Sequence, residues 1–150
     1  MDALLENIVD FLKARSDAKN QTLELELGQA DLPEITADAI ALESIFGNLI
    51  TNAINYTPVD GRITVKVDMA GINIRVQVSD TGFGIEAKHL ENIFDRFYRV
   101  KNEKTRYITG TGLGLPIVRE LVSAMGGMVD VESTPGQGST FTVLLPTAVQ

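Results

Sequence analysis

The sequence contains no cysteine and only one histidine, His89, among its 150 residues. The lack of cysteine excludes disulfide bonds, thiol nucleophiles, zinc ribbons and iron–sulfur clusters, and a single histidine excludes a histidine-rich metal site. No apolar run approaches the roughly 18 residues that a membrane-spanning helix needs, and the N-terminal segment lacks the residue order of a signal peptide. We therefore expect a cytoplasmic protein without direct membrane contact.

Basic residues are also in the minority, with 13 Lys and Arg against 20 Asp and Glu and a net charge of −7. Because a nucleic-acid-binding surface normally requires a basic face, this balance argues against a nucleic-acid partner. Apolar residues make up 44% of the chain and charged residues 22%, which is close to the average for globular proteins. A chain of this length is typical of one domain, which we place over residues 1–150.

The spacing of apolar residues predicts helices mixed with hairpins. The predicted helices cover 2–16, with Phe11 among the apolar positions, then 39–56 after an Asp38 N-cap, a short segment at 87–94, and a helix that follows a glycine cluster and ends at Gly126-Gly127. Alternating segments predict strands over 22–27, 35–36, 63–69, 72–78, 128–132 and 139–145. This order favours an α+β sandwich over a doubly wound sheet.

Three asparagines stand out in the helix predicted over 39–56. At about 100° per residue, Asn48, Asn52 and Asn55 share one stripe, and the opposite side is apolar (Ile45, Phe46, Leu49, Ile50 and Ala53). A solvated polar face is one interpretation, but asparagine is a poor helix former and solvated faces usually carry Glu and Lys. Amide oxygens are good neutral ligands for Mg²⁺, which takes water and phosphate oxygens as its other ligands.

The strand predicted over 72–78 leads into Ser79-Asp80-Thr81-Gly82-Phe83-Gly84-Ile85. Asp80 has the same parity as the apolar residues of that strand, so its side chain is predicted to point toward the core. A carboxylate in that position needs hydrogen-bond donors. Helix N–H groups are one source of donors, and the exocyclic amine of an adenine is another. Gly82 and Gly84 would allow a flat ring or a backbone to approach closely.

A second glycine-rich segment, Thr109-Gly110-Thr111-Gly112-Leu113-Gly114-Leu115-Pro116, precedes a predicted helix. Glycines before a helix N-terminus leave main-chain N–H groups free to receive phosphate, although glycine-rich turns without a ligand are common. The segment is neither a P-loop nor the dinucleotide fingerprint. Before it lies the basic and aromatic stretch Phe94-Asp-Arg96-Phe97-Tyr98-Arg99-Val-Lys101, which is typical of a mobile lid over a ligand. We place this lid at about residues 95–112.

Together these segments closely resemble the catalytic, ATP-binding domain of bacterial-type sensor histidine kinases. That family belongs to the GHKL superfamily, which also holds type II topoisomerase subunits, ninety-kilodalton heat-shock chaperones and mismatch-repair ATPases. The resemblance runs from about Leu4 to Pro146 and rests on four boxes in order, "NLITNAINYTP", "DTGFG", "FDRFYR" and "GTGLGL". It implies a Bergerat-type fold, a two-layer α/β sandwich with helices on one face of a mixed, mostly antiparallel sheet of about five strands.

The resemblance also implies a role for each box residue, with ATP or ADP and Mg²⁺ as cofactors. Asn52 would bind Mg²⁺. Asp80 would hydrogen-bond the adenine amino group, and Tyr56 would lie against the nucleotide. The two implied catalytic residues are Asn48, which would orient the metal and phosphates, and Arg99, which would reach the γ-phosphate. The other implied nucleotide contacts are Asn55, Gly82, Gly84, Ile85, Gly110, Thr111, Gly112, Leu113, Gly114 and Leu115.

The sequence departs from the family pattern at two positions. Asn55 stands where many members have Lys, so that Lys101, Lys104 or Arg106 would have to replace one contact to phosphate. His89 lacks the residues that follow a phosphoacceptor histidine, and we interpret it as a surface residue. The phosphoacceptor and dimerisation domain and the sensor domain are therefore expected outside this chain. We expect a monomer in isolation, and a homodimeric parent at the inner membrane that passes phosphate to a response regulator.

Three functions are compatible with such a domain: phosphoryl transfer to a histidine on another domain, an ATPase clamp, and a nucleotide-binding module without transfer. By the same resemblance, ATPase relatives carry a Glu four residues before the metal asparagine. Asn48 occupies that position here, and a neutral amide cannot act as a general base. An intact glycine box and the presence of Asn52 argue against the third function. We therefore favour the histidine kinase.

Overall fold

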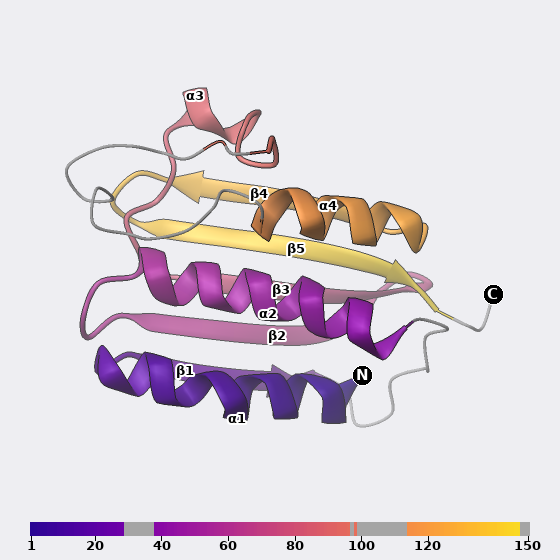
Figure 1. The fold of residues 1–150 in the computed structure, drawn as a ribbon, viewed down its shortest axis with the longest axis horizontal. Coiled ribbons are helices and arrows are strands. Elements are labelled where there is room, and N and C mark those ends of the chain that lie inside the picture. The colour runs from indigo at the N-terminus through magenta and orange to yellow at the C-terminus, as the bar shows by residue number, and fades with distance from the viewer. Residues whose placement is uncertain (29–37, 97, 99–113, 148–150) are drawn as a thin grey trace.

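The structure is a computed structural model that describes residues 1–28, 38–96, 98 and 114–147. One five-stranded sheet has the order β1-β2-β3-β5-β4, and β1 pairs in parallel with β2 while the other pairs are antiparallel. Helices α1, α2 and α4 lie side by side over one face of this sheet (Figure 1). The predicted α+β sandwich is therefore confirmed. The elements are α1 (Asp2–Ala18), β1 (Thr22–Leu27), α2 (Ala39–Tyr56), β2 (Arg62–Ala70), β3 (Asn73–Asp80), α3 (Ala87–Leu90), α4 (Gly114–Ala124), β4 (Met128–Thr134) and β5 (Gly138–Pro146).

Helix α2 is the central helix of the layer. The Asp38 side chain accepts a hydrogen bond of 2.8 Å from the amide of Ile40, which confirms the predicted N-cap. The helix ends at Tyr56 because Thr57 takes an extended backbone before Pro58. Its apolar side packs against the sheet, and the residues named above from the sequence are all buried there (Ile45, Phe46, Leu49, Ile50 and Ala53).

Three features differ from the predictions. Phe11 is 82% exposed, because the buried face of α1 passes through Leu12, and neighbouring helical residues point about 100° apart. Ile72 is 63% exposed, because Ala70 pairs with Asn73, which places Ile72 in the two-residue turn. The short helix α3 ends at Leu90 rather than at residue 94. The strand predicted over 35–36 lies outside the described residues.

Within the described ranges, no helix combines the length and the hydropathy needed to cross a membrane.

The contrast between Phe11 and Leu12 gives a test of the packing of α1. Leu12 is 5% exposed, so Leu12→Ala should lower the free energy of unfolding by about 2–5 kcal/mol. Phe11→Ser should change it by less than about 0.5 kcal/mol, because the ring contributes little burial. Urea denaturation of the two variants measures both values. A comparable loss for Phe11→Ser would show that the ring is covered in solution.

Candidate functional site

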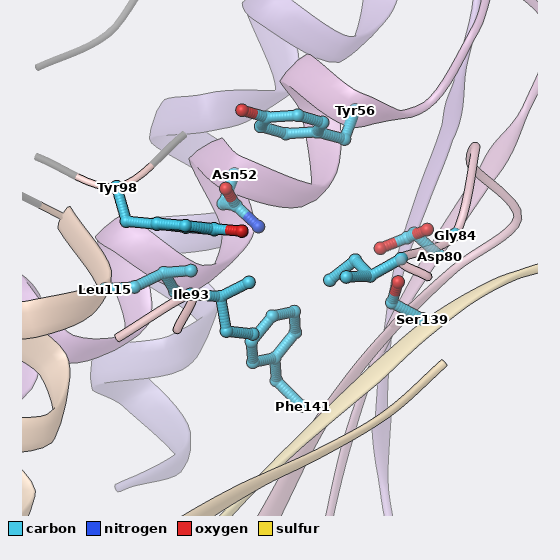
Figure 2. A pocket seen from close by; sticks show the side chains of 10 residues that line it. Asn52, Tyr56, Asp80, Gly84, Ile93, Tyr98, Leu115, Ser139 and Phe141 are labelled. Carbon is cyan, nitrogen blue, oxygen red and sulfur yellow. The ribbon is translucent and has the colours of Figure 1, made fainter. Parts of the chain in front are cut away.

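A pocket lies where the C-terminal ends of α2 and β3 meet. Asn52 and Tyr56 reach it from α2, while Asp80, Ser139 and Phe141 approach from the strands (Figure 2). The remaining lining residues come from the loop after β3, the segment after α3 and the start of α4 (Gly84, Ile85, Ile93, Tyr98 and Leu115). Elements far apart in the sequence thus contribute to one pocket.

The asparagine stripe of α2 is half-buried along its length. Asn52 lines the pocket, whereas Asn48 and Asn55 are not among its lining residues. The amide of Asn48 donates a 2.6 Å hydrogen bond to the carbonyl of Ser44. Its side-chain oxygen lies 3.2 Å from where a Cβ on Gly114 would stand. The beginning of α4 therefore packs against Asn48, so the asparagine box and the end of the second glycine box are neighbours.

Asp80 ends the buried face of β3, as predicted, after Ile74, Val76 and Val78. One of its carboxylate oxygens accepts a 2.9 Å hydrogen bond from the amide of Gly82. Burial raises the pKa of Asp80 to about 6, and main-chain hydrogen bonds from Gly82 and Ser139 partly oppose this rise. At neutral pH the pocket therefore contains a carboxylate that is ionised but incompletely compensated.

The loop after β3 packs between the main chains of Tyr56 and Thr134, and this packing requires glycine at positions 82 and 84. A Cβ on Gly82 would stand 2.3 Å from the main-chain oxygen of Tyr56. Gly84 has φ +73°, and a Cβ there would stand 2.2 Å from the main-chain oxygen of Thr134. The amide of Phe83 donates a 3.1 Å hydrogen bond to the carbonyl of Tyr56. Close backbone packing, and not only a ligand, therefore explains both glycines.

His89, which we interpreted from the sequence as a surface residue, makes a specific contact in the structure. It is half-buried, and its Nδ1 atom is hydrogen-bonded to the hydroxyl of Tyr98. The two rings are 5.8 Å apart between centroids. Because Tyr98 lines the pocket, His89 supports an aromatic wall of the site.

Four lining residues were not predicted as site residues: Ile93, Tyr98, Ser139 and Phe141. Ser139 is the register partner of Asp80, and Phe141 is that of Val78. The alternation of β5 could have shown that Phe141 faces the core, but not that β5 lies beside β3. The predicted site residues Arg99, Gly110, Thr111, Gly112 and Leu113 lie outside the described residues. Among the residues that are described, no cluster of acidic or histidine side chains could hold a metal ion.

Comparison with known proteins decides the family. Residues 37–149 match the family described as histidine kinase-, DNA gyrase B-, and HSP90-like ATPase. This chain belongs to that family. The chain is 38% identical over 144 residues to the phosphate regulon sensor protein PhoR of Pseudomonas aeruginosa, and the match covers 95% of this chain but 32% of PhoR.

Solved structures place this ATPase-family domain among the catalytic domains of sensor histidine kinases. The catalytic domain of the histidine kinase ThkA superposes with a TM-score of 0.84 at 26% identity, covering 98% of this chain and 92% of that one. Full-length ShkA, solved in complex with AMPPNP, gives a TM-score of 0.84 at 30% identity and covers 99% of this chain and 30% of ShkA. The domain is therefore of the histidine kinase catalytic type.

The raised pKa of Asp80 predicts an unusual pH dependence for the stability of this domain. Because the pKa is raised from 3.8 to about 6, the folded state retains the proton over a pH range in which the unfolded state has released it. Stability due to Asp80 is therefore lost as the pH rises through this window. The free energy of unfolding of the wild type, minus that of Asp80→Asn, should fall by about 2–3 kcal/mol from about pH 4 to about pH 7.

Urea denaturation without nucleotide measures this difference, and Asp68→Asn is the matched control. The hydrogen bond from Arg75 lowers the pKa of Asp68. The stability due to Asp68 is therefore present above its unfolded pKa and is lost on acidification. The free energy of unfolding of the wild type, minus that of Asp68→Asn, should thus rise with pH, opposite to the trend for Asp80→Asn. A difference for Asp80→Asn that is flat with pH would contradict the prediction.

Proposed function

We propose that this domain binds MgATP and transfers its γ-phosphoryl group to a histidine on a separate dimerisation domain. The observation that carries the proposal is the position of Asp80, a half-buried carboxylate that lines a pocket together with Tyr56 and Asn52. The exocyclic amine of adenine would supply the donor that this carboxylate lacks, and the aromatic and aliphatic lining suits a flat ring. The catalytic-domain relatives and the AMPPNP complex of ShkA support the same ligand.

The residues present fit one Mg²⁺ ion held jointly by protein and nucleotide. The Asn52 side chain is a neutral oxygen donor at the pocket, and Mg²⁺ usually keeps only one or two protein ligands beside phosphate and water. When bound, Mg²⁺ would neutralise charge on the phosphates.

Asn48 favours a kinase over an ATPase clamp. By the resemblance, ATPase relatives activate water with a Glu at this position, whereas the Asn48 amide is neutral and already donates to the carbonyl of Ser44. Phosphoryl transfer to histidine instead depends mainly on positioning and on stabilisation of charge. In the proposed mechanism Asp80 orients the adenine ring of the nucleotide. Gly114 and Leu115, at the start of α4, approach the phosphates, and Arg99 offsets charge on the transferring phosphoryl group.

The remaining parts of the reaction lie outside this chain. Since the chain spans about a third of PhoR, we propose that the acceptor histidine, the sensor and any membrane anchor belong to other segments of a longer, homodimeric and membrane-anchored protein. Its phosphohistidine would then be the donor to the receiver domain of a response regulator. The domain itself would work in the cytoplasm.

Selectivity for the base tests the role of Asp80. Guanine presents a carbonyl where adenine presents an amine, so the half-buried carboxylate of Asp80 would face an acceptor in place of a donor. We expect MgADP to bind up to about 10⁴-fold more tightly than MgGDP, and Asp80→Asn to lose most of this preference. Calorimetric titration measures both, with Asp10→Asn on the exposed side of α1 as a control. Equal affinity for the two nucleotides would refute the proposal.

Transfer itself tests the kinase against a binding module. Mixed with the dimerisation domain of its parent, the wild-type domain should place acid-labile phosphate from ATP on that domain and none on itself. Arg99→Ala should slow transfer by about 10²-fold while binding MgADP within a few-fold of wild type, because its contact strengthens in the transition state. Arg15→Ala is the matched control. Full transfer by Arg99→Ala, or phosphate on His89, would contradict these roles.

A further inference from the structure

The C-terminal turn of α2 carries nucleotide-site residues, but neither the helix itself nor the residue that follows it caps this turn. The last carbonyls of a helix lack intrahelical partners and need donors from elsewhere. The last turn of α2 has no basic residue, and Thr57 follows it in an extended conformation rather than in a glycine cap. Asn52 and Tyr56, which line the pocket, lie on or next to this turn.

The missing donors come from the junction between α1 and β1. The ammonium group of Lys19 donates hydrogen bonds of 2.9 Å to the carbonyl of Ile54 and 2.7 Å to that of Thr57. The side-chain amide of Gln21 donates to the same two carbonyls, at 3.0 Å and 2.7 Å. Gln21 is 5% exposed and Thr57 is fully buried. Two side chains thus share two carbonyl groups and close the end of α2.

Lys19 is also unusual in its electrostatic setting. The ion pairs found in the described part of the chain do not include it, and burial lowers its pKa. Its positive charge faces carbonyls at the negative end of the α2 dipole, where a cation is favourable. Within the described residues, the side-chain hydrogen bonds of Lys19 all go to carbonyls at the end of α2.

The same helix end also contacts the loop that follows Asp80 and β3. The carbonyl of Tyr56 accepts the hydrogen bond from the amide of Phe83, and only the lack of a side chain on Gly82 permits this approach. The end of α2 is thus held between Lys19 and Gln21 on one side and the loop after β3 on the other. A shift of this turn would move Tyr56 relative to Asp80, and with it two walls of the pocket.

We propose that Lys19 and Gln21 are positioning residues for the nucleotide site, which they hold in shape by capping the C-terminal turn of α2. The proposal rests on the proposed nucleotide binding and extends it to residues that touch no ligand. Both residues precede the segment 37–149 that matches the family. The proposal thus assigns a role in the nucleotide site to the α1–β1 junction, which lies before that segment.

The first test is the affinity for MgADP of Lys19→Met, which keeps the length of the side chain but removes its donors. Measured by calorimetry at a temperature where circular dichroism shows a folded domain, its Kd should rise about tenfold, because small displacements at a site are costly. Lys19→Arg should recover most of the affinity. Gln21→Met should also raise the Kd. The combined Lys19→Met and Gln21→Met variant should lose less binding free energy than the sum of the two single variants, because both side chains donate to the same carbonyls.

Lys13→Met is the matched control, since it removes the same charge from an exposed position of α1, six residues before Lys19. Its Kd should remain within about twofold of wild type, as for other surface changes. If Lys19 only stabilised the fold, Lys19→Met would lower the melting temperature and leave the Kd of the folded domain unchanged. That result would overturn the proposal.

Hydrogen exchange separates this proposal from the proposed function. In Lys19→Met without nucleotide, the amide of Phe83 should exchange about tenfold faster relative to that of Val65 in the middle of the sheet. Equal acceleration of the two amides would mean a global loss of stability and would refute the positioning role. Failure of the wild type to bind MgADP would refute the proposed function, and the exchange ratio would still decide whether Lys19 holds the end of α2.

Discussion

The rotation of α2 about its own axis is the constraint on which the pocket depends. Phe46 and Leu49 are fully buried against the sheet, while Asn52, about 60° around the helix from Leu49, lines the pocket. A rotation by one residue, about 100°, would expose a phenylalanine and bury an amide. Since both changes are unfavourable, the hydrophobic face of the helix decides which polar groups meet the pocket.

The second constraint is the cost of keeping Asp80 in its position. Burial raises its pKa to about 6, and two main-chain amides compensate only in part. A carboxylate that is unfavourable for folding and lines a pocket is typical of a site shaped for binding, because a ligand donor can supply what the protein does not.

Local patterns allowed much of this structure to be predicted. The boundaries of α2, its Asp38 cap, the orientation of Asp80 and the buried face of β3 all follow from spacing within one segment. Phe11 and Ile72 were misplaced because both are apolar residues next to the correct periodic positions, where helical phase or hairpin register must be known to within one residue. The sequence offered no comparable signal for the bond between His89 and Tyr98, which joins a helix to a non-repetitive segment.

The sequence by itself determined which elements form and which residue types carry the chemistry, because helical and strand periodicity act over a few neighbouring residues. The boxes also determined the family. Only the tertiary structure decided that Ser139 stands beside Asp80 and that Lys19 and Gln21 close the end of α2, contacts that span 59 and up to 38 positions along the chain. The physical reason is that strand order and helix-end capping by distant side chains depend on how whole elements pack, and no local pattern encodes that packing.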